Sequence, residues 1–308
     1  MKKLTIAYFG SPDFSADFLE KLITDITINQ LIEVKLVVTQ PDQKVGRKQI
    51  LTPTPVKLVA KKYLRSEDTK FFSLLGLGVP TVIKNFGIEL KNIDLALVYA
   101  YGDLIPKEIL NLPKYGFWNI HPSLLPKYRG PSPIATPLIN GDKITGVTII
   151  KMDEEIDHGP IIAQETYTIK SSDYRPDLEK KLTDLGFQMF KKLINELRIT
   201  NYELKIKEQN HKEVTFTNRL SKNDGFIEFG ELKSLIQLTT NHQSLVTFYN
   251  LFRGLYPWPG LWTILPNDKR LKITQLKIEN EKLIIEKVQL ESKSEVDFLT
   301  FNKAYNIF

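Results

Sequence analysis

Short apolar runs alternate with longer amphipathic segments along the first part of the chain. Such a run is typical of a strand that is buried on both faces, whereas apolar positions that recur every three or four residues are typical of a helix. Alternation of the two favours a doubly wound, mostly parallel sheet. We therefore predict an α/β, Rossmann-like fold, with strands at residues 4–9, 34–39 and 94–99 and helices at 14–23 and 55–63.

The alternation continues to about residue 200. The pattern predicts a short helix at 131–139, strands at 146–152 and 160–168, and a long helix at 177–197. We therefore expect residues 1–200 to form one domain.

The pattern changes beyond this point. Residues 201–214 are polar and break the helical period, which indicates a linker. Residues 271–278 and 282–290 alternate partly between apolar and polar positions, as antiparallel strands do, with a turn between them. Residues 215–308 are thus predicted to form a small β-rich domain. The stretch 229–252 reads as helical, and the pattern gives no physical reason for it.

Composition excludes several classes of site. The chain has 308 residues, no cysteine and four histidines, so disulfides, cysteine nucleophiles and thiolate metal sites are excluded. Scattered histidines rarely bind a metal, and we expect no metal.

No apolar run approaches the ~20 residues that cross a bilayer, and the first residues lead directly into a strand rather than a signal sequence. We expect a cytoplasmic protein with no membrane partner.

Positive charge is concentrated in one segment. The net charge of the chain is +6, whereas residues 35–65 hold eight lysines and arginines against one acid, Asp42, a local excess of +7. A charge run of this kind is more often a solvated loop than a binding site. Two details favour phosphate binding: Gly46 gives the segment mobility, and Lys57 and Lys61 would lie on one helix face.

The candidate chemistry lies at the end of a predicted strand at 117–121. Residues two apart in a strand point to the same face, so Asn119 and His121 would project together before Pro122 ends the ladder. An amide beside an imidazole can stabilise an oxygen that gains negative charge during acyl transfer. An isolated pair of this kind is more often a turn former and a hydrogen-bonded strand-end histidine, so the surrounding residues decide.

Those surrounding residues form a long motif, NIHPSLLP, at 119–126. It resembles the signature of the folate-dependent formyltransferases, and the chain is most similar to the members that act on methionyl-tRNA. Those members have a Rossmann-like catalytic domain followed by an OB-like β-barrel, which the resemblance implies for residues 1–200 and 215–308. Further matching stretches are FGSPDF (9–14), TQPD (39–42), TPTPVK (52–57), AYGDLIP (100–106), GVTIIKMD (146–153), RLSK (219–222) and YPWPGLW (256–262).

The resemblance implies a reaction and its catalytic residues. A formyl group would pass from 10-formyltetrahydrofolate to an amine, with no metal required. Asn119 and His121 would donate hydrogen bonds to the formyl oxygen. Asp157, in the matching segment 153–161, would orient or charge the imidazole and relay a proton.

The resemblance also implies a slot for the folate. Main-chain groups of one loop would meet the pterin, and a second loop would form a wall. Asp103 stands where the family more often has an apolar residue. The first loop comprises Tyr101, Gly102, Asp103, Leu104 and Ile105, and the second Ser123, Leu124, Leu125 and Pro126.

For the acceptor, the resemblance implies initiator methionyl-tRNA, a role in translation initiation, and action as a monomer. Residues 43–51 resemble the insertion that enters the tRNA acceptor stem, with Arg47 matching its functional arginine, and the C-terminal domain would also contact tRNA. We expect Lys44, Arg47, Lys48 and Lys57 to bind tRNA, and the first three to be disordered without it.

Two alternatives remain open. A formyltransferase for a small amine, such as glycinamide ribonucleotide or an amino-sugar nucleotide, would explain the catalytic residues but not the basic segment or the second domain. A non-catalytic RNA-binding module would explain the charge and the second domain, but such a module has no need of Asn119, His121 and Asp157 together. We favour the tRNA formyltransferase.

Overall fold

The computed structural model describes residues 2–46, 48–64, 70–72, 86–199, 205–237, 242–280 and 282–308. The chain forms two compact units that interleave along the sequence. The first comprises residues 1–131, 145–167 and 180–216, and the second comprises residues 132–144, 168–179 and 217–308. Two short segments from the range 1–200 therefore cluster with the C-terminal residues.

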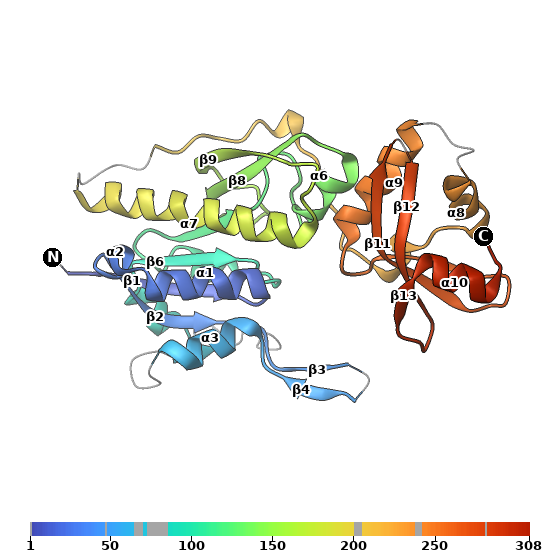
Figure 1. The fold of residues 1–308 in the computed structure, drawn as a ribbon. Coiled ribbons are helices and arrows are strands. Elements are labelled where there is room, and N and C mark those ends of the chain that lie inside the picture. The colour runs from blue at the N-terminus through green and yellow to red at the C-terminus, as the bar shows by residue number, and fades with distance from the viewer. Residues whose placement is uncertain are drawn as a thin grey trace. The chain divides into compact units, whose positions relative to one another are not determined.

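A seven-stranded sheet forms the centre of the first unit (Figure 1). Its strands are β1 (Leu4–Gly10), β2 (Ile32–Val38), β5 (Lys70–Phe72), β6 (Leu95–Tyr99), β7 (Phe117–His121), β8 (Ile144–Lys151) and β9 (Ile161–Thr168), in the order β5-β2-β1-β6-β7-β8-β9. The pairs β5-β2, β2-β1, β1-β6 and β6-β7 are parallel, and β7-β8 is antiparallel. The predicted α/β, mostly parallel sheet is confirmed.

Apolar side chains cover both faces of this sheet. Successive residues of a strand point to opposite faces, and in β1 Tyr8 stacks on Phe18 of α1 (Asp13–Thr24), whereas Phe9 packs on Phe117 of β7. Phe18 also contacts Phe187 of α7 (Arg175–Ile199), so α1 and α7 share one face. Burial on both faces explains why β1 reads as an uninterrupted apolar run.

Shorter elements complete this unit. They are α2 (Ile26–Asn29), α3 (Pro55–Tyr63), a helical turn at 86–91, α5 (Lys107–Leu110) and the 3₁₀ turn η1 (His211–Glu213). Helix α3 has the predicted bounds because Thr54 caps it, with its hydroxyl accepting from Lys57 N at 3.2 Å, and Pro55 occupies its first turn.

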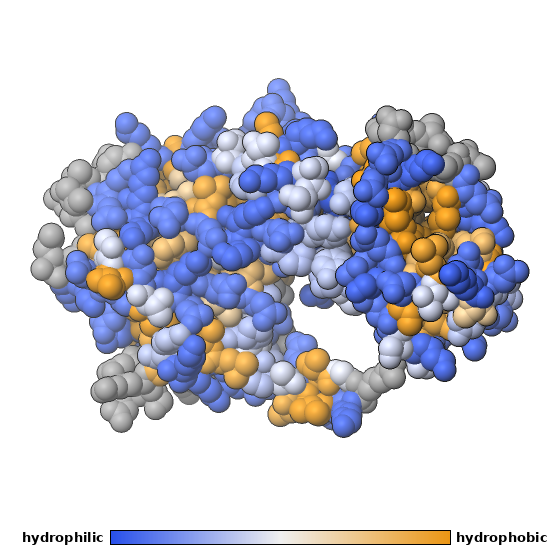
Figure 2. Space-filling model, in the orientation of Figure 1, coloured by the Kyte–Doolittle hydropathy of each residue, from blue (hydrophilic) through white to orange (hydrophobic). Residues whose placement is uncertain are grey.

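The basic segment contains an exposed hairpin. Strands β3 (Gln43–Val45) and β4 (Ile50–Thr52) pair antiparallel, and all six residues are exposed. Figure 2 shows apolar side chains gathered at this hairpin, and Val45, Ile50 and Leu51 are 55%, 60% and 63% exposed. Arg47 lies outside the described residues, and the expected disorder of Lys44, Arg47 and Lys48 without tRNA stays a prediction.

Helix α6 (Ala135–Asn140) begins later than the predicted 131–139. Pro131 and Pro133 explain the difference, because the helical region is disfavoured for a residue that precedes proline, and Gly130 and Ser132 each precede one. The helix ends at Gly141, whose φ of 74° closes it in the left-handed conformation.

The second unit contains a four-stranded sheet, in the order β10-β11-β12-β13. Its pairs are all antiparallel, which confirms the predicted small β-domain. The strands are β10 (Leu261–Ile264), β11 (Arg270–Glu279), β12 (Lys282–Leu290) and β13 (Glu295–Asp297), accompanied by η2 (Lys222–Gly225), α8 (Phe229–Ile236), α9 (His242–Leu255) and α10 (Phe298–Tyr305).

Helices α8 and α9 account for the helix-like stretch at 229–252. Leu232 and Leu235 of α8 and Phe248 and Phe252 of α9 are buried in one cluster with the apolar residues of β11 and β12. The stretch therefore supplies helices that cover the small sheet. Among the described residues, no helix combines the length and apolar character that a membrane crossing requires.

Candidate active site

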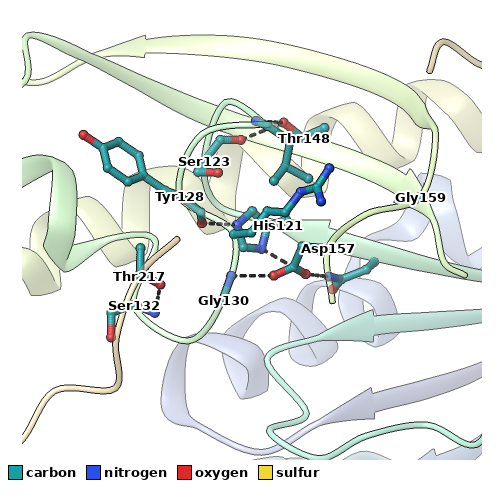
Figure 3. Close-up of polar contacts among 12 residues, drawn as sticks. His121, Ser123, Tyr128, Gly130, Ser132, Thr148, Asp157, Gly159 and Thr217 are labelled. Carbon is teal, nitrogen blue, oxygen red and sulfur yellow. Dashed lines mark hydrogen bonds and ion pairs between the residues drawn. The ribbon is translucent and has the colours of Figure 1, made fainter. Parts of the chain in front are cut away.

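Strand β7 carries the two polar side chains that the motif singled out. Its end lies between the parallel strand β6 and the antiparallel strand β8, in the interior of the sheet. Asn119 and His121 both face the loop that contains Asp157, as their spacing predicts. Figure 3 shows His121 beside Asp157. His121 is buried and Asn119 is half-buried.

Asp157 lies against both side chains. Its Oδ1 accepts a hydrogen bond from Asn119 Nδ2 at 3.0 Å and lies 3.4 Å from His121 Nδ1. Its Oδ2 accepts from Gly130 N at 2.8 Å. The side chain therefore connects its own loop to strand β7 and to the loop at Gly130, and its 3.4 Å separation from His121 Nδ1 is slightly longer than a direct hydrogen bond.

The backbone at Asp157 is unusual. Its φ is 50°, in the left-handed region that residues other than glycine rarely occupy. Nearby, Gly159 comes so close to Lys151 O that an added Cβ would lie 1.9 Å from that oxygen. The loop between β8 and β9 is thus held in one conformation by close packing.

The imidazole of His121 has a defined orientation. Its Nε2 lies 2.9 Å from the carbonyl oxygen of Tyr128 (Figure 3). A carbonyl oxygen only accepts hydrogen bonds, so Nε2 carries a proton, and Nδ1 then faces the carboxylate of Asp157. A second proton on Nδ1 would complete the pair with that carboxylate and place a positive charge beside Asn119.

The predicted folate wall is a tightly bonded loop. Ser123 and Leu125 are buried, and Leu124 and Pro126 are half-buried. Thr148 connects the ends of the loop: its hydroxyl donates to Ser123 O at 2.7 Å and accepts from Leu125 N at 3.1 Å. The Ser123 hydroxyl donates to Lys127 O. Ser123 therefore shapes the loop and Leu125 is buried, which leaves Leu124 and Pro126 as the apolar surface available to a ligand.

The other predicted folate loop follows β6. Tyr101 is buried, and its carbonyl accepts from the Ser11 hydroxyl at 2.9 Å, while Gly102 O accepts from Gln40 Nε2 at 3.2 Å. Asp103 and Ile105 are half-buried, and the Asp103 carboxylate accepts from Leu104 N. Leu104 is 73% exposed. Gly102 is also exposed, so the main chain at Gly102 and the side chain of Leu104 are the parts of this loop that a flat heterocycle could contact.

The predicted tRNA-binding residues fall into three groups. Lys44 and Lys48 are exposed on and beside the hairpin. Lys57 forms an ion pair with Asp42, with 2.6 Å between Nζ and Oδ1. The pairing offsets its charge, so Lys57 is less available to a phosphate than its sequence position indicates. Arg47 lies outside the described residues.

Several residues that contact the site were not predicted from the sequence. Tyr128 and Gly130 act through main-chain atoms, which leave no mark in a side-chain pattern. Gln209 lies in the predicted linker, yet its Nε2 donates to the carbonyl oxygens of Asp157 and Gly159. A single glutamine in a polar stretch gives no signal of such a role.

No group of three or more histidine, aspartate or glutamate side chains is arranged to hold a metal ion within the part of the chain that the structure describes. His158 forms a 2.6 Å contact with Asp153 and stacks on His211, with ring centroids 4.3 Å apart. These rings belong to the loop that precedes β9 and to η1.

Comparison with known proteins identifies the family of this site. Residues 2–194 match the family model described as formyl transferase, and residues 236–284 match the model for its C-terminal domain. The chain is 40% identical to a methionyl-tRNA formyltransferase of Caldicellulosiruptor saccharolyticus, over 89% of this chain and 80% of the relative. It is 36% identical to a methionyl-tRNA formyltransferase of Mesoplasma florum, over 91% of this chain and 81% of that relative.

Solved structures share the fold. A phosphoribosylglycinamide formyltransferase from Bacillus halodurans aligns with 65% of this chain and 98% of its own, at a TM-score of 0.52 and 26% identity. A 4-N formyltransferase from Francisella tularensis aligns with 88% of this chain and 97% of its own, at a TM-score of 0.63 and 20% identity, and shows the fold alone. With identities of 36–40% over most of its length to methionyl-tRNA formyltransferases, this chain belongs to the formyl transferase family and, within it, to that group.

Proposed function

We propose that the chain transfers the formyl group of 10-formyltetrahydrofolate to the methionine amine of initiator methionyl-tRNA, a cytoplasmic step of translation initiation. The observation that carries the proposal is the contact of Asp157 with both Asn119 and His121 at the end of β7. The reaction develops negative charge on a formyl oxygen and releases a proton, and these side chains match both needs.

The chemistry follows from the hydrogen-bond inventory of the site. The amine attacks the formyl carbon, electrons move to the formyl oxygen, and the bond from that carbon to the folate nitrogen then breaks. Asn119 Nδ2 has two hydrogens and gives one to Asp157, so the other can meet the oxyanion. His121, charged when both ring nitrogens are protonated, would stabilise the same oxygen. Asp157 would take the amine proton through water, and this proton would pass on to the folate nitrogen as the bond to that nitrogen breaks.

The folate would lie between the two loops that the sequence indicates. Residues 101–105 offer main-chain groups and the exposed side chain of Leu104. The loop 123–126 offers apolar side chains on a backbone that Thr148 and Gln164 hold, since Gln164 Nε2 donates to Leu125 O at 2.9 Å. These loops would contact the flat pterin ring of the folate, which carries the formyl group to be transferred.

The acceptor is proposed from features outside the catalytic residues. Relatives that are similar over most of the chain are methionyl-tRNA formyltransferases. The hairpin β3–β4 extends the first unit with exposed lysines and apolar side chains, which a small amine would not need. A nucleic acid needs cationic side chains along its backbone.

The test is a transfer assay with the purified chain. It is incubated with 10-formyltetrahydrofolate and initiator methionyl-tRNA, and the amino acid released from the tRNA is analysed by mass spectrometry. The proposal predicts N-formylmethionine, and none when the tRNA is not aminoacylated or when free methionine replaces it. Absence of the formylated product from methionyl-tRNA would refute it.

A further inference from the structure

Two buried polar side chains, Gln209 and Arg129, join the loops that surround Asp157. Each is only 4% exposed. A buried amide or guanidinium is destabilising unless its polar atoms are hydrogen-bonded, so the partners of these two groups explain why they are there. Gln209 comes from the segment 205–216, which lies far from both loops in the sequence.

Gln209 uses both ends of its amide. Its Nε2 donates to Asp157 O and to Gly159 O, both at 2.8 Å, which accounts for both amide hydrogens. Its Oε1 accepts from Arg129, at 2.7 Å from Nη2 and 3.3 Å from Nε. One side chain therefore connects the main chain of residues 157–159 to the residue between Tyr128 and Gly130.

Both connections end at the partners of the proposed catalytic residues. Tyr128 provides the carbonyl that accepts from His121, and Gly130 provides the N–H that donates to the Asp157 carboxylate. Asp157 itself has a φ of 50°, a conformation that persists only where the surroundings fix it. The bond from Gln209 to the carbonyl of Asp157 acts directly on this residue.

Arg129 has a second partner that holds it in place. Its Nη2 lies 2.9 Å from His211 Nδ1, and since a guanidinium only donates, this ring nitrogen accepts. His211 in turn stacks on His158, the residue that follows Asp157. The segment 205–216 thus contacts the Asp157 loop through Gln209 and through His211.

We propose that Gln209 is a positioning residue for formyl transfer. Through Arg129 and the main chain of residues 157–159, it holds the Asp157 carboxylate against Asn119 and His121. The inference rests on the proposed function, because that function gives Asp157 its part in the reaction. It assigns a catalytic contribution to a segment that the sequence presents as a linker.

Gln209→Glu is the informative variant. It keeps the size of the side chain and an oxygen acceptor for Arg129, but it turns an oxygen toward the carbonyls of Asp157 and Gly159. We expect kcat to fall by about 10-fold or more, because small displacements of a catalytic group have large effects on rate. KM for the folate and for methionyl-tRNA should change by less than about twofold, since Gln209 is buried and its amide is fully bonded within the chain. Gln188→Glu, the same change at an exposed position of α7, is the matched control and should leave kcat unchanged.

A double variant separates positioning from a purely structural role. In the Asp157→Asn background, Gln209→Glu should lower kcat little further, because its effect passes through Asp157. If the two substitutions lower kcat independently, so that the fall in the double variant is the product of the two single falls, positioning is contradicted. If Gln209→Glu fails to fold, Arg129→Lys takes its place in both comparisons, since it keeps the charge but loses the forked donors.

A crystal structure of the Gln209→Glu protein decides the question independently of the acceptor. The inference predicts that Asp157 loses its contact with Asn119 or with Gly130. An Asp157 that keeps both contacts, or an unchanged kcat, overturns the inference. A wild-type protein that does not formylate methionyl-tRNA would instead refute the proposed function, and the position of Asp157 in the crystal would still show whether Gln209 holds it.

Discussion

The carboxylate of Asp157 is where three segments of the chain meet, through Asn119, His121 and the main chain of Gly130. The spacing of Asn119 and His121 made part of this arrangement predictable, because strand geometry alone puts both on one face. The contacts of Tyr128 and Gly130 were not predictable, since they use main-chain atoms that every residue has. The role of Gln209 depends on tertiary contacts that no local pattern encodes.

At this scale the first prediction concerns the two side chains proposed to stabilise the oxyanion. Asn119→Ala removes a hydrogen-bond donor and His121→Ala removes the imidazole, and each should lower the rate of formyl transfer by about 10²-fold or more, as loss of one stabilising group at a developing oxyanion does. The check is kcat for methionyl-tRNA, with circular dichroism to confirm that each variant folds. Turnover near the wild-type value in both variants would remove the pair from the mechanism.

The elements were predictable where apolar periodicity is strong. β1 and β12 have nearly the predicted bounds because β1 is an apolar run and β12 partly alternates, and α3 has them because Thr54 and Pro55 fix its start. The hairpin β3–β4 was not predicted, because two short exposed strands have no buried face to produce a period. Helix α6 was predicted too long because proline effects outweigh an apolar run.

A second prediction concerns the packing of α6 on α9. A Cβ added at Gly254 would lie 2.5 Å from Ile139 Cγ1 and 3.0 Å from Ala135 O, so Gly254→Ala should lower the free energy of unfolding by about 1–3 kcal/mol. Gly230 of α8 has open space around it, and Gly230→Ala should stabilise by about 0.5–1 kcal/mol. Urea unfolding of both variants checks this. If both variants changed the free energy of unfolding by the same amount in the same direction, the packing argument would be contradicted.

A third prediction concerns the cap of α2. Asp25 accepts from Thr27 N and Ile28 N, and the hydrogen bond from Ile28, with a further contribution from Lys191, holds the pKa of Asp25 below its ordinary value. Asp25→Ala should therefore lower the free energy of unfolding by about 1 kcal/mol at neutral pH.

The sign of the pH dependence follows from the lowered pKa of Asp25. A carboxylate with a depressed pKa stabilises the fold above its unfolded-state pKa, and this stabilisation is lost as the pH falls through the folded-state value. The stability gap between the wild type and Asp25→Asn, which keeps the acceptor but not the charge, should close over that acidic range. A gap that stays constant from neutral to acid pH would show that the charge contributes nothing.

At the scale of the whole molecule, the two compact units do not follow the order of the chain. Residues 132–144 and 168–179 belong to the second unit although they lie within the range 1–200. Arg253 shows why: its guanidinium is buried and donates to the carbonyl oxygens of Lys170, Ser171 and Asp173. Contacts of this kind join segments that are about 80 residues apart, and a period read along the chain does not reveal them.

At this scale the fourth prediction concerns tRNA. Replacing Lys44 and Lys48 with alanine should weaken methionyl-tRNA binding, with kcat at saturating tRNA little changed. The slope of log K against log salt should become shallower by about one unit for each lost phosphate contact. Lys192→Ala, on the exposed side of α7, is the control for loss of a surface charge. An unchanged affinity and slope would mean that the hairpin is merely solvated.

The central claim is the identity of the acceptor, and one measurement tests it most directly: kcat/KM for initiator methionyl-tRNA and for glycinamide ribonucleotide, with the same 10-formyltetrahydrofolate supply. If the hairpin and the second unit serve tRNA, the value for methionyl-tRNA should exceed the other by at least about 10²-fold, since only the larger acceptor uses those contacts in the transition state. A value for glycinamide ribonucleotide that equals or exceeds it would contradict the account and favour a small-amine formyltransferase.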